Sequence, residues 1–226
     1  MCGFFEFNNS SSQADELIEA LGIEDQAPMF RKNLGSGPAS SVDIVVQSGN
    51  ERIVVPAVWW LLLDQQTLKP SRYTSFNTRS DKLNVKNSAG YHPYRQHRCI
   101  IPATAVVEGE GPKGSRKYHR IEPQHCAFAL GGLYRQWINK DSGEHATSCS
   151  VITLSPHPAW EKIHSKSTPL FLPHDDKALI DAWLDPAFTQ VDKFDQLLTP
   201  TFRDSMLITP IDRPSTRQPV GDSFIL

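Results

Sequence analysis

The chain has 226 residues, of which 39% are hydrophobic and 21% charged, and its formal net charge at pH 7 is -2. This composition excludes an intrinsically disordered chain, and the small negative charge excludes a protein that coats nucleic acid through bulk positive charge. A localised basic groove remains compatible with it, because the distribution of charge matters more than the sum.

The first half of the chain predicts short strands and one helix. Met1–Phe7 alternates loosely between apolar and polar residues and predicts a strand. The segment QADELIEALG predicts a helix with Ser12 as its N-cap and Gly22 as its stop signal. Ser41–Val46 and Arg52–Val58 are β-rich runs around a Ser-Gly-Asn turn, which predicts a hairpin. A buried apolar run then covers 59–63, and a polar loop is expected over 64–75.

The second half adds more strands and two late helices. Strands are expected over residues 99–102, 105–107, 117–121, 127–133, 147–154 and 205–208. Helices are expected over Asp176–Trp183 and Phe188–Leu197. Many short strands with few helices indicate an α+β fold with a curved, barrel-like, mainly antiparallel β core and a few peripheral helices. Without a repeat or a linker, we expect one domain over residues 1–226.

The cysteines do not form a metal or disulfide pattern. Cys2, Cys99, Cys126 and Cys149 have no CxxC spacing, so neither a zinc knuckle nor a thioredoxin-type motif is supported. They are too few for a disulfide framework, which favours a reducing compartment. No run approaches the roughly 20 apolar residues that span a bilayer, and the first residues lack a signal-peptide pattern. We therefore expect a protein without a membrane partner.

Cys2 stands out because of its position. Initiator Met is normally removed before a small residue, which would leave Cys2 with both a thiol and an α-amine at the mature N-terminus. Both groups are nucleophiles near neutral pH, and together they suit an aldehyde. The amine forms an imine and the thiol closes a thiazolidine ring, while Gly3 leaves the backbone room to bend. From these residues alone, an incidental second-position cysteine is an equal alternative.

Glu108 and His164 are candidate acid–base groups. Glu108 follows the apolar run 105–107, where partial burial would raise its pKa and suit it to proton transfer. Glu110 lies on the same face by alternation, so position alone does not choose between the two acids. His164 ends a short helical segment and titrates near neutrality. The alternatives are an ordinary strand-end acid and one of the chain's scattered histidines.

Several polar and aromatic residues could contact nucleic acid. Asn77 could bind a sugar hydroxyl, and Arg79 could clamp a phosphate, although an Asx turn followed by a solvated charge is the alternative. Trp59 and Trp60 could stack on bases of a single strand, but their apolar neighbours favour core packing for at least one of them.

The order of these motifs carries a family resemblance. The chain has MCG at its start, F-N-x-R-S-D at 76–81, R-C-I-I-P-A followed by Glu108 six residues after Pro102, and T-x9-I-H at 153–164. The ordered set resembles the SOS response-associated peptidase (SRAP) family of abasic-site DNA–protein crosslinking proteins, over roughly residues 2–170.

The resemblance implies a role for each matching residue. Cys2 would crosslink to the ring-opened sugar aldehyde, and Asn77 would lie beside the sugar. Glu108 would assist proton transfer, and His164 would help ring opening and stabilise the imine. Arg79 and Thr153 would hold the DNA backbone. The implied function is covalent capture of abasic sites in single-stranded DNA, with thiol peptidase or lyase-like chemistry at Cys2 in the DNA damage response.

The chain also departs from the family pattern. Phe4 stands where the family commonly has Arg, and the usual W-G-L-x-P becomes Trp59–Leu63 without its Gly and Pro. Gly109 follows Glu108 where the family has an aromatic residue, and Lys166 replaces an Arg. These changes indicate a divergent branch in which chemistry at Cys2 transfers more safely than DNA affinity.

Three other functions compete with this hypothesis. They are a class II glutamine amidotransferase, which also begins Met-Cys-Gly, a thiol autopeptidase that exposes Cys2, and a non-covalent module for modified DNA. For the main hypothesis we expect a monomer that needs no metal or organic cofactor. We expect it in the cytoplasm, at the nucleoid in a bacterium or in the nucleus of a eukaryote.

Overall fold

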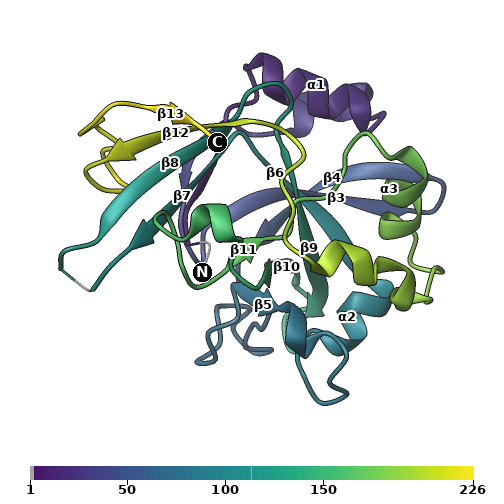
Figure 1. Ribbon diagram of the computed structural model, residues 1–226. Helices are drawn as coiled ribbons and strands as arrows, with labels where there is room; N and C mark the ends of the chain where they lie inside the picture. Colours follow the sequence, from purple (N-terminus) through teal and green to yellow (C-terminus); the bar gives the residue numbers. More distant parts are fainter. Residues whose placement is uncertain (1–2, 113) are drawn as a thin grey trace.

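The computed structural model describes residues 3–112 and 114–226 and has an α+β fold dominated by strands (Figure 1). Five strands pair in a ring: β3 (Ser41–Ser48), β4 (Glu51–Val58), β6 (Arg98–Ala103), β9 (Phe128–Ile138) and β10 (His145–Leu154). Pairing of β9 with β10 closes the ring into a barrel. Only the β10–β4 pairing is parallel within this ring. The barrel-like, mainly antiparallel core expected from the sequence is therefore confirmed.

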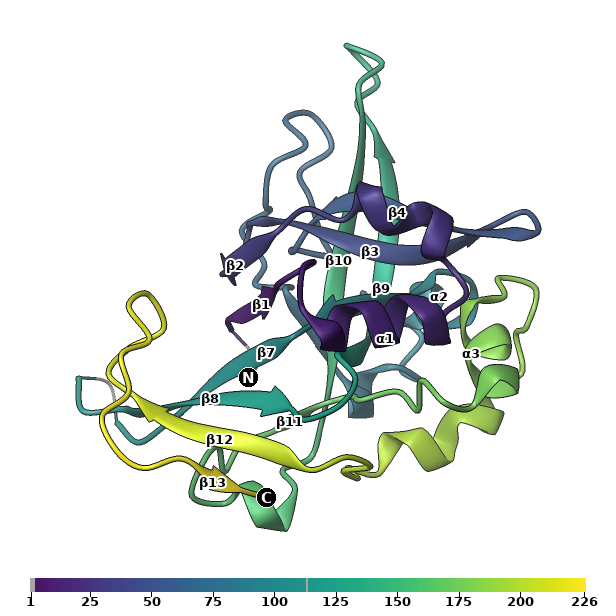
Figure 2. The ribbon, with the colours of Figure 1, turned by 90° about the horizontal axis from the view of Figure 1, so that it is seen from above.

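A second sheet extends from the barrel and is antiparallel throughout its described pairings. Its order is β13 (Phe224–Ile225), β12 (Met206–Ile211), β8 (Lys117–Pro123), β7 (Ala105–Glu110), β1 (Phe5–Phe7) and β2 (Asn33–Ser36). Figure 2 shows β12 and β13 at the opposite end of the molecule from α3 (Lys177–Leu184). Strand β1 begins two residues after Gly3, the first described residue, and its neighbour β7 contains Glu108.

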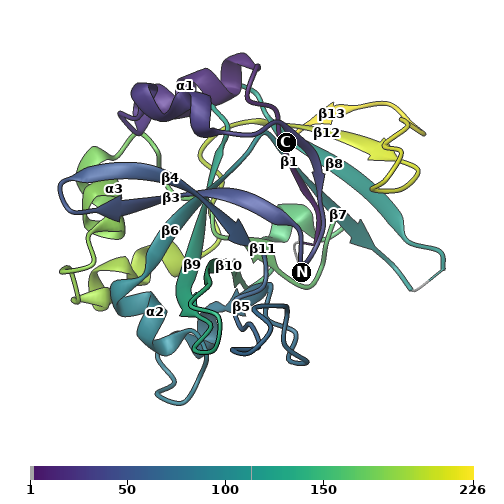
Figure 3. The same cartoon turned by 180° about the vertical axis from the view of Figure 1, so that it is seen from behind.

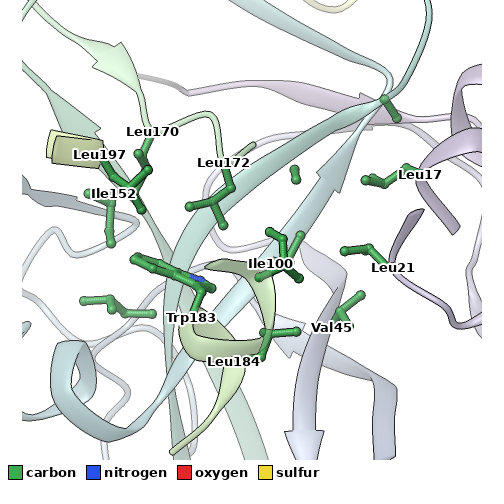
Figure 4. Packing of buried hydrophobic residues seen from close by; sticks show 14 of the residues in the cluster. Leu17, Leu21, Val45, Ile100, Ile152, Leu170, Leu172, Trp183, Leu184 and Leu197 are labelled. Carbon is green, nitrogen blue, oxygen red and sulfur yellow. The ribbon is translucent and has the colours of Figure 1, made fainter. Parts of the chain in front are cut away.

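Strand alternation divides the core into two clusters. Val45 of β3 packs with Leu17 of α1 (Ser12–Ala20) and Trp183 of α3 in one cluster, which Figure 4 shows from close by. The flanking Ile44 and Val46 belong to the other cluster. Because successive strand side chains point to opposite faces, one barrel wall supplies both clusters. Figure 3 shows α1 and α3 covering the outside of the barrel.

The helix predictions are confirmed in part. Helix α1 has Ser11, not the expected Ser12, as its N-cap, because the Ser11 hydroxyl accepts a hydrogen bond from Ala14 N at 3.3 Å. Gly22 follows its end with φ +61°, which fits the predicted stop signal. Helix α3 begins after Asp176, whose carboxylate accepts from Leu179 N at 3.0 Å. None of the helices in the described ranges is both long and apolar enough to cross a bilayer.

The helix expected over Phe188–Leu197 is wrong in type and extent. The structure has a 3-10 helix over Val191–Leu198 instead. The carbonyls of Asp185 and Phe188 accept hydrogen bonds from the buried guanidinium of Arg98, at 2.6 and 2.9 Å. Carbonyls that are oriented toward Arg98 do not continue a helical ladder, so the helix begins later.

The other predicted strands are confirmed, usually with longer bounds. The described part of the first strand is Phe5–Phe7, while Met1 and Cys2 lie outside the described residues. Helix α2 (Tyr91–Gln96) and strand β5 (Asn77–Arg79) lie where the sequence predicts no element. Strand β5 pairs in parallel with β10, and the short β11 (Thr168–Pro169) pairs with the same strand. Further 3-10 helices cover Glu24–Met29, Ser80–Lys82 and Pro158–Trp160.

Candidate active site

A cavity of about 340 Å³ opens where the second sheet meets the segment that follows β10. Its lining includes Gly3, Phe4, Glu108, Tyr118, His164 and Lys166. The segment before β1 and the strands β7 and β8 therefore contribute to one hollow together with the loop that carries His164. The sequence separation of these residues exceeds 150 positions, so only the fold brings them together.

Strand pairing fixes Phe4 and Phe5 beside this cavity. Phe5 pairs with Val106, and Val107 N donates a hydrogen bond to Phe4 O at 2.9 Å. Gly3 is the first described residue and lines the cavity with Glu108. Cys2, the expected nucleophile, lies outside the described residues.

Glu108 and His164 form a buried pair. Glu108 is 2% exposed, and its Oε2 lies 3.7 Å from Nδ1 of His164. The same Nδ1 lies 3.0 Å from the carbonyl oxygen of Gly109, so it donates to that oxygen in the neutral ring and Nε2 is then the acceptor nitrogen. Burial lowers the pKa of His164, although the bond to Gly109 and the charge of Glu110 oppose this effect. A carboxyl and an imidazole at this separation are both groups that can transfer protons.

Glu110 occupies a different environment from Glu108. Its Oε2 accepts a hydrogen bond from Ser165 N at 2.6 Å, and this bond holds the pKa of Glu110 below its ordinary value. Glu110 thereby fastens the end of β7 to the residue that follows His164. Burial beside the histidine distinguishes Glu108 as the better candidate for acid–base chemistry, a choice that strand alternation leaves open.

Strands β5 and β10 bring the expected backbone-binding residues together. Arg79 pairs with Thr153 in the parallel register, and both line a second hollow of about 470 Å³. Lys166 lines this hollow as well as the cavity of Glu108, so the two adjoin. Arg79 is also paired with Asp81 at 2.8 Å. Asn77 begins β5 and is half-buried, directly after Phe76 of the cavity lining.

The two tryptophans differ in position. Trp59 is fully buried, packs against Phe5 with ring centroids 4.6 Å apart, and donates from Nε1 to Phe76 O at 2.8 Å. The expected base-stacking role does not fit this position, because the ring belongs to the core. Trp60 is half-buried with its ring centroid 5.7 Å from that of Phe76. Only Trp60 of this pair remains a proposed DNA contact.

The cavity residues that are absent from the sequence-based candidates include Phe4, Arg116 and Tyr118. The register of β7 with β8 places Tyr118 opposite Gly109. A sequence signal for this pairing exists in Gly111, Pro112 and Gly114, because glycine and proline are typical of hairpin connections. No three His, Cys, Asp or Glu side chains in the described part of the chain are arranged to hold a metal ion.

Comparison with solved structures shows the same fold in other proteins. A protein from Bacteroides thetaiotaomicron is similar at TM-score 0.71 and 19% identity, covering 93% of this chain and 92% of that one. A protein from Bordetella bronchiseptica is similar at TM-score 0.69 and 16% identity, covering 94% of this chain and 100% of that one.

Comparison of sequences gives the family. The abasic site processing protein YoqW of Bacillus subtilis is 27% identical over 210 residues, which cover 91% of this chain and 90% of the relative. The abasic site processing protein YobE of the same organism is 28% identical over 210 residues, which cover 91% of this chain and 92% of the relative. The family model "SOS response associated peptidase (SRAP)" matches residues 1–214. The chain therefore belongs to the SRAP family.

Proposed function

We propose that this protein captures abasic sites in single-stranded DNA as a covalent adduct of Cys2. The observation that carries the proposal is the buried pair of Glu108 and His164, 3.7 Å apart, in a cavity lined by Gly3. An acid–base pair thus lies next to the chain segment that begins with the expected nucleophile. Membership of the SRAP family and the names of the relatives YoqW and YobE support the same substrate.

The proposed chemistry balances without a cofactor. After removal of Met1, the α-amine of Cys2 adds to the C1′ aldehyde of the ring-opened deoxyribose. The resulting carbinolamine loses one water and becomes an imine. The thiol then adds across the C=N bond, sulfur bonding to carbon and the thiol proton moving to nitrogen, which closes a thiazolidine.

Glu108 and His164 move protons in this scheme. A protonated group next to the sugar assists departure of the ring oxygen and then of the carbinolamine hydroxyl as water. A neutral imidazole accepts a proton, which the lowered pKa of His164 favours at neutral pH. The carbonyl of Gly109 fixes the imidazole orientation through the 3.0 Å bond at Nδ1.

The remaining residues bind the strand. Arg79 and Lys166 supply positive charge in the adjoining hollow, where Thr153 also lies, and these groups suit phosphates. Asn77 suits the sugar, and the half-buried ring of Trp60 suits a base. A single strand fits best, because a sugar must leave a duplex to reach a carboxyl that is 2% exposed.

We further propose one domain that acts as a monomer in a reducing compartment. The family model's match to residues 1–214 supports the single domain. Cys99, Cys126 and Cys149 are buried free thiols, which supports the cytoplasm or another compartment that keeps thiols reduced.

A denaturing gel tests the proposal. The purified protein is incubated with single-stranded oligonucleotides that carry an abasic site, a uracil or no lesion, and Cys2→Ala is run beside it. A shifted band with the abasic strand alone, lost in Cys2→Ala, is the expected result. No band from protein whose Met1 is shown absent by mass spectrometry would refute capture and direct attention to glutaminase and peptidase assays.

A further inference from the structure

Two aromatic side chains line the cavity on the face of the second sheet opposite to Glu108. Phe4 lies beside Val107, whose N–H donates to its carbonyl, and Tyr118 lies opposite Gly109 on β8. Because Val107 and Gly109 are two residues apart, their side-chain positions share a face, and Phe4 and Tyr118 flank it. Both rings belong to the lining of the cavity that holds the proposed acid–base pair.

The Tyr118 ring lies directly over the backbone of Gly109. A Cβ at Gly109 would meet Cδ1 and Cε1 of Tyr118 at 2.8 Å. Any residue other than glycine at position 109 would therefore displace the ring. The residue that follows Glu108 is thus kept small, and an aromatic face from the neighbouring strand takes that space.

Phe4 is also held in place. Its Cζ lies 3.0 Å from where a Cβ of Gly35 would be, and the Arg217 guanidinium lies 5.8 Å from its ring centroid. Arg217 is itself fixed by Glu6, with Nε 3.2 Å from Oε1. An aromatic ring that is already ordered loses little entropy when a flat ligand stacks on it.

We propose that Phe4 and Tyr118 form a stacking site for the base next to the abasic position. This inference rests on the proposed function. An abasic nucleotide has no base of its own, so aromatic rings elsewhere in the lining of the same cavity can only meet the base of a neighbouring nucleotide. Aromatic side chains bind single-stranded bases in this way with little sequence preference. Arg116, an exposed cation in the same lining, lies at the same hairpin and suits the intervening phosphate.

The test removes the flanking bases and keeps the phosphates. Single-stranded oligonucleotides carry one abasic site between two purines, two pyrimidines or two tetrahydrofuran spacers, which lack both a base and an aldehyde. The measured quantity is the crosslinking rate constant divided by the half-saturating DNA concentration. We expect about a tenfold loss from purines to spacers, which corresponds to about 1.4 kcal/mol.

Variants assign the effect to the two rings. Tyr118→Leu and Phe4→Leu should each lower the ratio of rate constant to half-saturating concentration for purine-flanked DNA. The ratio for purine-flanked DNA should then lie closer to that for spacer-flanked DNA. Tyr118→Phe keeps the ring and should retain the wild-type ratio. Phe224→Leu, an exposed phenylalanine on the edge strand β13, is the matched control.

Three results would overturn the stacking site. Equal crosslinking of purine-flanked and spacer-flanked DNA by the wild type would refute it while leaving covalent capture intact. If none of the oligonucleotides is crosslinked, covalent capture is refuted, and the stacking site is refuted with it. A flanking-base effect that survives unchanged in Tyr118→Leu and Phe4→Leu would place the stacking elsewhere.

Discussion

Replacement of Glu108 by Gln isolates proton transfer at the candidate site. The amide has the size of the carboxyl and still forms hydrogen bonds, but it cannot titrate. Glu108 is 2% exposed and lies 3.7 Å from His164, so bulk water does not readily substitute for it. The variant therefore removes the proton-carrying function with little change in packing.

The expected loss is large. A positioned acid or base contributes about 10²- to 10⁴-fold to a rate, so we expect Glu108→Gln to slow adduct formation by about 10²-fold or more. Glu110→Gln is the informative comparison, because its amide oxygen can still accept from Ser165 N, which lies 2.6 Å from Glu110 Oε2. That variant should slow the reaction by less than about tenfold.

Single-turnover kinetics measures the effect. Protein in excess reacts with a labelled abasic strand, and denaturing gels follow the adduct at saturating protein. Borohydride added at intervals reduces any imine and so separates imine formation from ring closure. A rate for Glu108→Gln equal to that of the wild type, with both proteins equally folded, would refute the assigned role.

Three further predictions concern stability. Burial lowers the pKa of His164, so the unfolded chain takes up a proton before the folded one as the pH falls below about 6.5. The free energy of unfolding, measured by urea titration, should therefore decline below that pH. A free energy of unfolding that stays constant would contradict this. In Gly132→Ala the new Cβ would meet Ser150 O at 3.0 Å, so we expect a loss of about 1–3 kcal/mol by the same titration, whereas Gly37→Ala, with nothing within 4 Å, should be neutral. Glu6→Gln removes the charge of the buried carboxylate that pairs with Arg120 at 2.8 Å. This variant should lower the free energy of unfolding by about 2 kcal/mol, and an unchanged urea midpoint would contradict the prediction.

Sequence patterns predict the strands of this fold well because the strands are short and strongly apolar. Alternation within 41–46 and 52–58, with a Gly-containing turn between them, is enough to place the hairpin of β3 and β4. The late 3-10 helix shows the limit of this approach. The start of this helix depends on Arg98, which is about 90 positions earlier in the chain and donates a hydrogen bond to the carbonyl oxygen of Phe188.

The candidate site is predicted in its residues but not in its arrangement. Strand position alone cannot prefer Glu108 over Glu110, and in the sequence only the family resemblance makes that choice. The structure adds a physical reason, because Glu108 is buried and Glu110 accepts the bond from Ser165. The apolar neighbours of Trp59 and Trp60 favour core packing for at least one of them, and the structure shows that Trp59 is buried against Phe5. Tyr118 is missed because its relation to the cavity arises from the pairing of two strands.

Mapping of the adduct tests the central claim most directly. The crosslinked protein is digested with nuclease and protease, and the modified peptide is identified by mass spectrometry before and after treatment with borohydride and a thiol-alkylating reagent. We predict that the N-terminal peptide beginning at Cys2 carries the ring-opened sugar with loss of one water, gains no hydrogen from borohydride and has no alkylatable thiol. An adduct on a lysine, or a Cys2 peptide whose thiol remains alkylatable, would contradict the thiazolidine.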